Sequence, residues 1–532
     1  LLVLLLAKLT NLVPEGGIWM NTQRPEWNDA NNALVGKGLS VVTAAYLRRF
    51  IAFWQTLLAA YDGADFGVNT AVATLLGDVQ TIFSHFQDRL GSGFSDSDRR
   101  AVMDALGTAV TAYRRTLYQT GLPQTQQPLT AADLADFLTL AQRYIEHTLH
   151  VNRRSDGLAH TYNILRLSAE SAGIEPLYLM LEGQVALLSS GLLAPEAALA
   201  LLQSLRHSDL YRADQHSYML YPHRHLPGFR QKNNVTAVQV AHSPLVQALR
   251  AAGDKRLLLE DEAGMFHFNG RFRNASDVTA VLHTMRQEAE LAELVAGEQE
   301  FILELFETTF NHRAFTGRSG TFFAYEGLGS IYWHMVTKLL LAAQECYQQA
   351  VEEEAETTVI TALADAYYDI RAGIGFNKTP DVYGAFPTDP YSHTPLGNGA
   401  RQPGMTGQVK EEILTRWGEL GVAVRSGQLC FAPTLLRRDE FVSGSSAFVY
   451  VNAHGETQTL SLPPDSLAFT FCQTPIVYTV GDGVKIEVVW ADGRSQTIPG
   501  HCLDQTISQH IFERSGEVRL VRVWLGMERK RP

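Results

Sequence analysis

The chain has 532 residues, with 44 Lys and Arg against 56 Asp and Glu, and a net charge of −12 at neutral pH. Apolar residues make up 45% and charged residues 19%, which excludes a disordered or collagen-like chain. The acidic balance argues against nucleic acid or a membrane surface as a partner. The four cysteines show no Cys-x-x-Cys pair, so we predict reduced, buried thiols and a cytoplasmic protein.

The chain opens with an apolar run from Leu1 to Leu6, which is too short to span a bilayer. No basic residues precede it and no small-residue cleavage site follows it, so it does not resemble a secretory signal. We predict that it ends a buried element and that Pro14-Glu15-Gly16-Gly17 forms the turn after it. A chain that opens inside an apolar element is expected to be a fragment or one half of a split protein.

Helical periodicity dominates from about Gly38 to Trp417, where apolar residues recur at steps of three and four. Ser95-Asp96-Ser97-Asp98 and the pair Thr130 and Asp133 have the residue types that cap helix starts. Further amphipathic helices are predicted around residues 179–189, 195–205, 277–296, 327–351 and 356–372. Long loops are expected at residues 209–238 and 373–404, and loops of that length in a compact domain are usually functional.

After about Arg425 the pattern changes to short runs rich in β-branched residues. Strands are predicted at residues 447–451, 476–480, 484–490 and 518–524. Asp482-Gly483 and Asp492-Gly493 are turn dipeptides beside these strands. We therefore predict a helical domain over residues 1–425 and a small all-β domain over residues 426–532.

The most informative segment is Arg24-Pro25-Glu26-Trp27-Asn28-Asp29, in a predicted loop before the first long helix. A carboxyl beside an indole ring is partly desolvated, which raises its pKa and keeps it protonated. A protonated carboxyl that reaches a glycosidic oxygen acts as a general acid. Asp29 is therefore a candidate acid, and the alternative is that it makes turn or capping hydrogen bonds.

Three segments resemble the inverting glycoside phosphorylases, the family of cellobiose and chitobiose phosphorylases. Trp27-Asn28-Asp29 is similar to the catalytic-acid segment, and Gly329-Ser330-Ile331-Tyr332-Trp333-His334 is similar to the family's Gly-x-Ile-Phe-x-His. Thr406-Gly407, followed by Leu420-Gly421-Val422 and Ala432-Pro433, resembles the phosphate-binding Thr-Gly and the Leu-Gly-Ile segment after it. The three segments also occur in the family's order.

The resemblance implies a mainly α fold, an (α/α)6 barrel or toroid, followed by a C-terminal β domain. It also implies that Asp29 protonates the leaving oxygen while inorganic phosphate attacks the anomeric carbon from the opposite face, with inversion. His334, Thr406 and the Gly407 backbone would hold the phosphate, whose charge suits the unpaired N–H groups of a helix start. The expected partners are an oligosaccharide and phosphate as co-substrate, with no cofactor.

The residues expected to bind the sugar lie near these segments: Arg24, Trp27, Asn28, Tyr325, Glu326, Asp389 and Tyr391. A further polar cluster, His216 with His223-Arg224-His225, stands in the loop 209–238. Histidines at this density suggest a metal, but no ligand set is recognisable. We therefore expect no metal, and a polar loop that bonds to itself or to the sugar.

Two features depart from the family's pattern. The interval from Asp29 to Thr406 is longer than in cellobiose phosphorylase and resembles that of the phosphorylases of β-1,2-linked oligoglucans. Few residues precede Asp29, whereas the family carries a large β-sandwich and several barrel helices before the acid. Either a second chain or a homodimer partner completes the barrel, or the missing part was lost, or the later helices close a toroid alone.

Two other functions stay open. An inverting glycoside hydrolase on the same barrel would use water and a carboxylate base, with Asp389 and Glu326 as the candidates. These two residues would otherwise be turn or cap residues. A carbohydrate-binding remnant would be inactive because part of the barrel is absent. Dependence on phosphate separates the phosphorylase from the hydrolase, and any turnover excludes the remnant.

Overall fold

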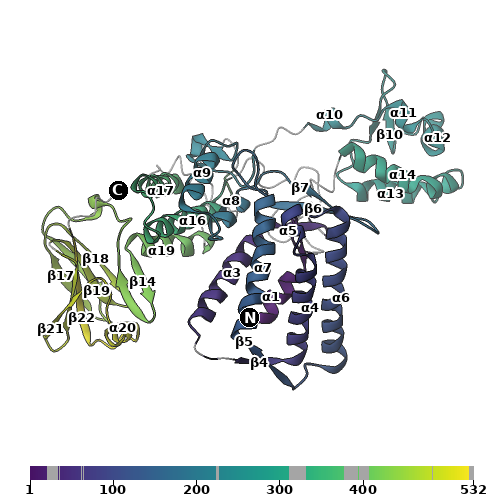
Figure 1. Ribbon diagram of the computed structural model, residues 1–532. Helices are drawn as coiled ribbons and strands as arrows, with labels where there is room; N and C mark the ends of the chain where they lie inside the picture. Colours follow the sequence, from purple (N-terminus) through teal and green to yellow (C-terminus); the bar gives the residue numbers. More distant parts are fainter. Residues whose placement is uncertain are drawn as a thin grey trace. The chain divides into compact units, whose positions relative to one another are not determined.

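The structure is a computed structural model that describes residues 1–20, 34, 36–61, 63, 65–222, 227–310, 331–376, 393–394, 406–481 and 483–526. It divides into two compact units, shown in Figure 1 and each treated by itself below. The first unit is Leu1–Leu193, Gln203–Met335 and Pro380–Gln402, and the second is Ala194–Leu202, Val336–Thr379 and Pro403–Pro532. Among the helices of the described residues, none has both the length and the apolarity that crossing a bilayer requires.

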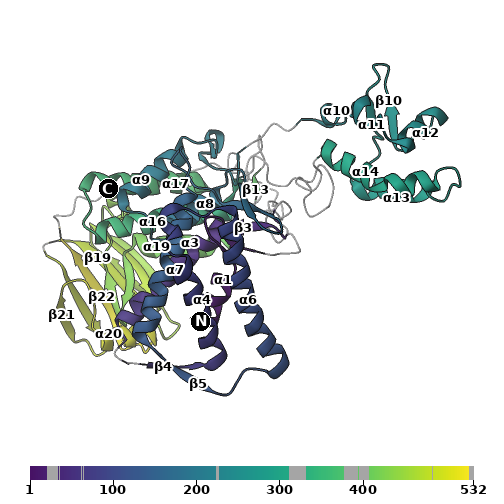
Figure 2. The same cartoon turned by 45° about the vertical axis from the view of Figure 1, so that its right-hand side comes forward.

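Five helices of the first unit pack around one apolar core, and Figures 1 and 2 show them side by side. They are α1 (Leu2–Leu9), α3 (Val41–Ala59), α4 (Thr70–Phe86), α6 (Asp96–Thr120) and α7 (Ala131–Val151). The apolar run that opens the chain is α1, and Leu5, Leu6 and Leu9 are fully buried in this core. The prediction that this run belongs to a buried element is confirmed.

Both predicted helix caps are present. Ser95 accepts a hydrogen bond from the N–H of Asp98 at the start of α6, and the Asp98 carboxylate accepts one from the N–H of Ser95. Thr130 accepts from the N–H of Asp133 at the start of α7, at 2.9 Å. These bonds satisfy donors that the first helical turn leaves unpaired, so both helix starts are encoded by local sequence.

A five-stranded antiparallel sheet interrupts the helices of the first unit, in the order β1-β2-β3-β6-β7. Its strands are β1 (Leu12–Val13), β2 (Gly17–Trp19), β3 (Gly38–Ser40), β6 (Tyr162–Leu167) and β7 (Ala172–Pro176). The helical periodicity did not predict this sheet, because three of its strands have only two or three residues. Such strands are too short for an alternating pattern to appear.

The other elements of the first unit before residue 222 are short. They are β4 (Asp65–Asn69), α5 (Arg89–Ser92), β5 (Gln126–Thr130), α8 (Leu181–Leu188), α9 (Pro195–Arg206, shared with the second unit), β8 (Tyr211–Arg212), the 3-10 turn Ala213–Gln215 and β9 (Ser217–Tyr218). The predicted helices at 179–189 and 195–205 are therefore confirmed. The predicted loop at 209–238 instead contains the β8–β9 hairpin and, further on, two short helices.

Residues 227–310 form a module with its own apolar core. Its elements are α10 (Phe229–Lys232), α11 (Ala237–Val240), α12 (Pro244–Ala252), β10 (Leu258–Glu260), β11 (Phe266–Phe268), α13 (Ala275–Met285) and α14 (Ala292–Phe310). The ends of the module meet, since the ring of Phe229 stacks on that of Phe310 with centroids 5.6 Å apart. Lys232 also donates a hydrogen bond to the carbonyl of Phe310, at 2.9 Å. Closed ends and a separate core are typical of an inserted domain.

The single helix predicted at residues 277–296 was wrong, because α13 and α14 are separate helices. The turn between them, residues 286–291, contains neither glycine nor proline. Packing of both helices on the shared core, including Leu282 and Val295, makes the break. Local sequence carries no signal for a break of this kind.

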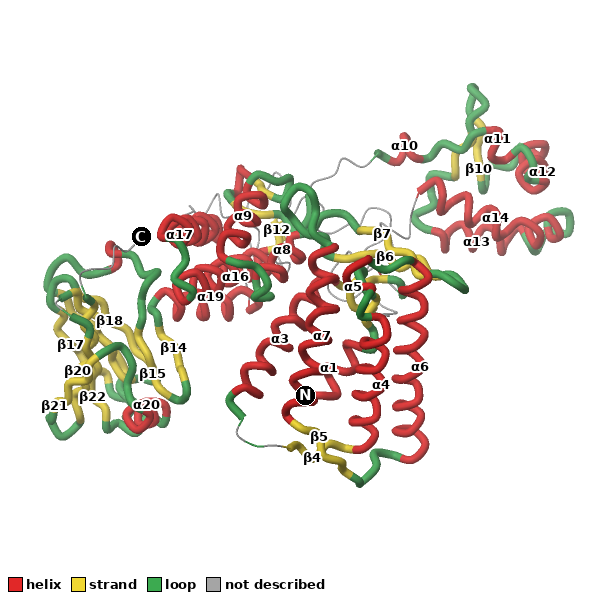
Figure 3. The backbone as a smooth tube through the Cα atoms, in the orientation of Figure 1, coloured by secondary structure: helices red, strands yellow, loops and turns green. Residues whose placement is uncertain are grey.

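The second unit joins helices to a β domain, whose strands are yellow in Figure 3. Its helices are α16 (Trp333–Glu352, which starts in the first unit), α17 (Thr357–Arg371), the π-helix Ala372–Phe376, α19 (Thr406–Glu419), the 3-10 turn Arg438–Glu440 and α20 (Gln505–Phe512). Its strands are β14 (Val422–Arg425), β15 (Gln428–Phe431), β16 (Ser446–Val451), β17 (Thr457–Leu462), β18 (Ser466–Phe471), β19 (Thr474–Val480), β20 (Lys485–Trp490), β21 (Ser495–Pro499) and β22 (Val518–Leu525).

All four predicted C-terminal strands are present, and the main sheet has the order β18-β19-β22-β20-β21. The domain is not all-β as predicted, because α20 packs Ile507 and Ile511 into the same core as Leu429 and Ile476. The prediction of reduced thiols was wrong for one pair, since Cys430 and Cys502 form a disulfide. They are 72 residues apart and face each other across an antiparallel bridge, a pairing that no sequence spacing reveals.

A buried carboxylate ties α19 to α17 and to the start of the β domain. Glu419, whose side chain is 1% exposed, accepts hydrogen bonds from Tyr367 at 2.6 Å and from Arg416 at 2.6 Å. Arg371 lies 3.2 Å from the same carboxylate, and Arg416 also pairs with Glu440 at 2.7 Å. Burial and the neighbouring Glu419 raise the pKa of Tyr367, which keeps its hydroxyl a donor. Each buried charge in this cluster therefore has a partner.

We expect Glu419→Ala to lower the free energy of unfolding by about 3 kcal/mol, because it removes the buried carboxylate to which Tyr367, Arg371 and Arg416 all bond. Glu352→Ala is the matched control in the same unit, since it breaks an Arg–Glu pair with Arg425 whose side chains are more than half exposed. Exposed pairs contribute about 0–1 kcal/mol. Urea unfolding of both variants measures the difference. Equal losses of unfolding free energy in the two variants would show that the Glu419 cluster stabilises the unit no more than an exposed ion pair does.

Candidate active site

The loop that carries the candidate acid starts and ends on paired strands. Arg24, Trp27, Asn28 and Asp29 lie outside the described residues, but β2 and β3 bracket them and pair antiparallel, with Trp19 opposite Leu39. The N–H of Met20 donates to the carbonyl of Gly38 at 3.0 Å, and the indole N–H of Trp19 donates to that of Gly36 at 3.1 Å. Both ends of the loop are therefore held together at its base.

His334 is the second residue of α16 and is half-buried, whereas its neighbour Trp333 is fully buried. The Tyr332 hydroxyl lies 3.2 Å from His334 Nδ1, a hydrogen bond in which either group can donate. The imidazole is therefore oriented by the residue two positions before it. A histidine of this kind can use its other ring nitrogen for a ligand.

Two of the predicted loops come together at the strand before His334. Strand β12 (Ile331–Tyr332) pairs antiparallel with β13 (His393–Thr394), which lies in the loop predicted at 373–404. Strand β9, from the loop predicted at 209–238, also contacts β12. The structure thus joins segments that are far apart in the sequence. Asp389 and Tyr391, just before β13, and Tyr325 and Glu326, before β12, lie outside the described residues.

The described part of the polar loop at 209–238 bonds to itself. His216 Nδ1 lies 3.0 Å from the Tyr211 hydroxyl, and the Arg206 guanidinium lies 3.6 Å above the Tyr211 ring. Arg212 pairs with Asp214 at 2.9 Å. His223, Arg224 and His225 lie outside the described residues. Within the residues that the structure does describe, no group of three metal-binding side chains is close enough to hold an ion.

Thr406 is the first residue of α19, so the predicted phosphate segment opens a helix. The side chains of residues 406–409 lie outside the described part of the structure. The Leu-Gly-Val segment after the helix is explained by packing. Gly421 has φ +64°, and a Cβ on it would lie 2.1 Å from the backbone of Ala432. Only glycine fits at this position. Backbone packing therefore explains why Gly421 is present in the family-like segment, without any role in phosphate binding.

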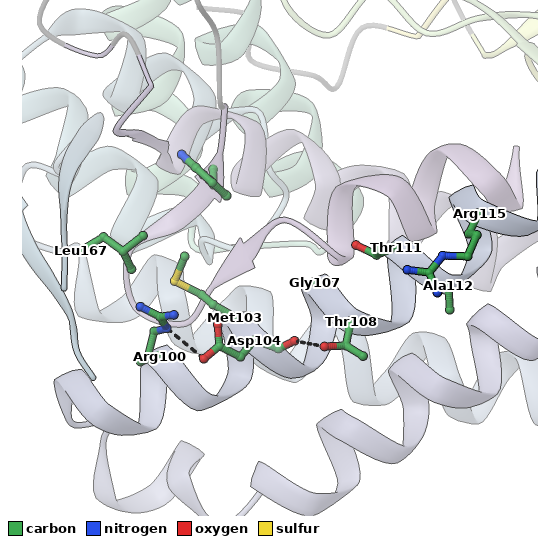
Figure 4. A pocket seen from close by; sticks show the side chains of 10 residues that line it. Arg100, Met103, Asp104, Gly107, Thr108, Thr111, Ala112, Arg115 and Leu167 are labelled. Atoms are coloured by element: carbon green, nitrogen blue, oxygen red, sulfur yellow. Dashed lines mark hydrogen bonds and ion pairs between the residues drawn. The ribbon is translucent and has the colours of Figure 1, made fainter. Parts of the chain in front are cut away.

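A hollow of about 630 Å³ runs along α6 beside the base of the acid loop (Figure 4). Its lining includes Trp19, Met103 and Leu167, together with the pair Arg100 and Asp104, whose atoms are 2.9 Å apart. The only carboxylate among the lining residues is thus already paired with an arginine. The hollow therefore has no free acid or base for hydrolysis or phosphorolysis.

Sequence reasoning missed a polar cluster at the turn before β2. Glu15 was predicted only as a turn residue, and Arg99 and His147 were not singled out. All three meet in one polar cluster, with the Glu15 carboxylate 2.6 Å from Arg99 and 3.2 Å from His147. A signal was available, because a charged residue between Pro14 and Gly16-Gly17 has to find partners when the turn is buried.

Residues 226–313 match the family described as GH149 phosphorylase insertion domain 2. The matched segment coincides with the 227–310 module, whose core and closed ends are those of an inserted domain. No curated protein matches the chain. The match supports a glycoside phosphorylase family for this chain, and with it a carbohydrate-active enzyme.

Proposed function

We propose that the chain is an inverting glycoside phosphorylase that cleaves β-linked gluco-oligosaccharides with Asp29 as the general acid. The observation that carries the proposal is the position of the phosphorylase insertion domain. It lies between Asp29 and Thr406, inside the interval that the three phosphorylase-like segments define. The segments and the domain are independent signals for a glycoside phosphorylase.

In this mechanism a phosphate oxygen forms a bond to the anomeric carbon while the glycosidic C–O bond breaks on the opposite face. The electron pair of that bond goes to the leaving oxygen, which takes the proton of Asp29. Because phosphate is already an anionic nucleophile, the enzyme needs no carboxylate base. Trp27, Asn28, Arg24 and Tyr391 would hold the sugar so that the leaving oxygen meets the Asp29 proton.

His334, Thr406 and the Gly407 backbone would bind the phosphate. Two observations support this assignment. His334 is the second residue of α16 and Thr406 the first of α19, and helix starts attract anions through their unpaired N–H groups. In the second unit the two helices touch further along, where Gln344 of α16 donates to the carbonyl of Thr415 in the last turns of α19, at 2.7 Å.

The β-1,2 linkage remains a prediction. It rested on the length of the interval between Asp29 and Thr406, and the 227–310 module accounts for part of that length. Linkage therefore has to be decided by assay on β-1,2-, β-1,3- and β-1,4-linked gluco-oligosaccharides. The (α/α)6 barrel, its completion by a second chain or a homodimer partner, and the cytoplasmic location are likewise proposals.

We expect Asp29→Asn to lower phosphate-dependent cleavage by about 10²–10⁴-fold, the usual contribution of a positioned acid. Sugar affinity should change little, because the amide keeps the size and the hydrogen-bonding capacity of the carboxyl. Initial rates and equilibrium binding on the same oligosaccharide check the two expectations. A variant with unchanged turnover would remove Asp29 from the acid role.

His334→Ala and Thr406→Ala should each raise the KM for phosphate by about 10–100-fold, the scale of one hydrogen bond to a charged group. The KM for the sugar should move much less, and Thr406→Ser should restore phosphate affinity. His216→Ala is the matched control, a half-buried histidine that also bonds to a tyrosine hydroxyl. Sugar release that is equal with and without phosphate in the unmutated protein would contradict the proposal and favour the hydrolase.

Asp389 distinguishes the hydrolase from the phosphorylase. The pairing of β13 with β12 favours a role for its loop, because that pairing brings the loop to the strand before His334. In a hydrolase Asp389→Ala should cost about 10²-fold or more, and added azide should restore the rate. A phosphorylase should lose less and gain nothing from azide. If Asp389→Ala leaves the cleavage rate unchanged and phosphate has no effect on that rate, Glu326 becomes the base to test.

A further inference from the structure

The 227–310 module contains a histidine whose two ring nitrogens both face hydrogen-bond acceptors. His267, on β11, has its Nδ1 2.5 Å from the carbonyl oxygen of Asn233. Its Nε2 lies 3.2 Å from the Asp261 carboxylate. A carbonyl and a carboxylate can only accept hydrogen bonds. Both contacts are therefore hydrogen bonds only when both ring nitrogens carry a proton, which makes the imidazole a cation.

The two acceptors belong to separate parts of the module. Asn233 comes directly after α10, on the segment by which the chain enters the module, and Asp261 comes directly after β10. The other oxygen of Asp261 accepts from the N–H groups of Ala263 and Met265, at 2.9 and 2.8 Å. This carboxylate is therefore fixed to the turn between β10 and β11. The charged imidazole joins the entry segment to the β10–β11 hairpin.

Asn233 stands at the neck of the module, where the chain enters and leaves it. Its buried side chain donates to the carbonyl of Phe268 and accepts from the N–H of the same residue, both at 2.8 Å. The ring of Phe268 packs beside that of Phe310, with centroids 6.0 Å apart. Phe310 ends α14, the last helix of the module. A change of charge at His267 therefore acts on the neck.

The elements packed against β11 carry other charged groups. Glu260 of β10 pairs with Arg250 of α12 at 2.6 Å, and Lys232 of α10 bonds to the carbonyl of Phe310. Within the part of the chain that the structure describes, Asp261 is the charged residue that forms an ion pair with His267. The remaining charged residues on α10, the β10–β11 turn and α14 are Arg230, Glu262, Glu293, Glu298, Glu300, Glu304 and Glu307.

These contacts make the strength of the neck depend on pH. The hydrogen bond to Asn233 raises the pKa of His267, partial burial opposes the rise, and Asp261 adds to it. A raised pKa means that the stabilisation is complete below the ordinary histidine value of about 6.5 and is lost as the pH rises through the folded value. The N–H of Met265 and His267 lower the pKa of Asp261, so its contribution is lost only in acid.

We propose that His267 is a pH-sensitive clip at the neck of the 227–310 module. In its charged form it ties the entry segment at Asn233 to the hairpin at Asp261. In its neutral form it has a single N–H, so one of the two acceptors faces a lone pair and is released. The clip acts within the module and does not depend on the chemistry of the proposed active site.

Hydrogen–deuterium exchange of the full chain, followed by mass spectrometry, tests the clip. Peptides covering residues 229–235 and 258–268 are compared at about pH 5.5 and about pH 8.5, on either side of the ordinary histidine pKa. Uptake is corrected for the intrinsic exchange rate at each pH. We expect the opening equilibrium of these segments to rise by about 3–10-fold at the higher pH, the scale of one partly exposed hydrogen bond between charged groups.

His267→Gln removes the titrating group, so it should abolish this pH difference and leave the neck as open at the lower pH as at the higher one. His283→Gln is the matched control, because His283 is an exposed histidine of the same module, on α13. It should keep the full pH difference. Asp261→Asn keeps an oxygen for the turn but loses the charge, and it should reduce the difference.

Equal protection of the unmutated neck at both pH values would overturn the proposal. A pH difference that persists in His267→Gln, or one that disappears in His283→Gln, would also overturn it. If His267→Gln leaves the module unfolded at both pH values, Asp261→Asn decides, and an unchanged pH difference in that variant rejects the clip. Loss of phosphate-dependent turnover plays no part in these outcomes, so failure of the clip and failure of the proposed function are separate results.

Discussion

The contact between Arg99 and Glu15 is the interaction that holds the turn between β1 and β2 of the first unit. It joins the start of α6 to a tight turn between two short strands, and both side chains are nearly buried. A pair in this setting is expensive to break, because the remaining charge has no water to replace its partner. The pair therefore helps to fix one geometry for the turn, from which the chain leads directly into β2.

The second unit also contains a buried charged cluster. Glu419 is buried among Tyr367, Arg371 and Arg416, and it holds the last turn of α19. The helix that Thr406 opens is thus anchored at its far end. The Thr406-Gly407 segment is short, and the helix that it opens ends on a buried charged cluster that has no counterpart in the motif itself.

Local sequence predicted the features that depend on neighbouring residues. The caps at Ser95 and Thr130, the buried α1 and the C-terminal strands were predicted correctly because each is encoded within a few residues. The five-stranded sheet, the Cys430–Cys502 disulfide and the break between α13 and α14 were missed. Each of them arises from contacts between residues distant in the sequence or from shared packing, which periodicity does not report.

The residues of the candidate site were likewise predicted from the sequence only in part. The sequence motifs identified Asp29, His334 and Thr406 as candidates, and the structure then showed His334 bonded to Tyr332 and Thr406 at a helix start. Periodicity and motifs did not indicate that Glu15, Arg99 and His147 meet in one cluster. The 227–310 module explains why the chain is long between its motifs, and its match supplies the independent link to phosphorylases.

The central claim is that phosphate, not water, cleaves the β-glycosidic bond with inversion. Proton and phosphorus NMR of the first product formed from a β-linked gluco-oligosaccharide in phosphate buffer tests it most directly. The account predicts α-glucose 1-phosphate, appearing only when phosphate is present. Free α-glucose as the first product, at a rate that phosphate does not change, would contradict the account.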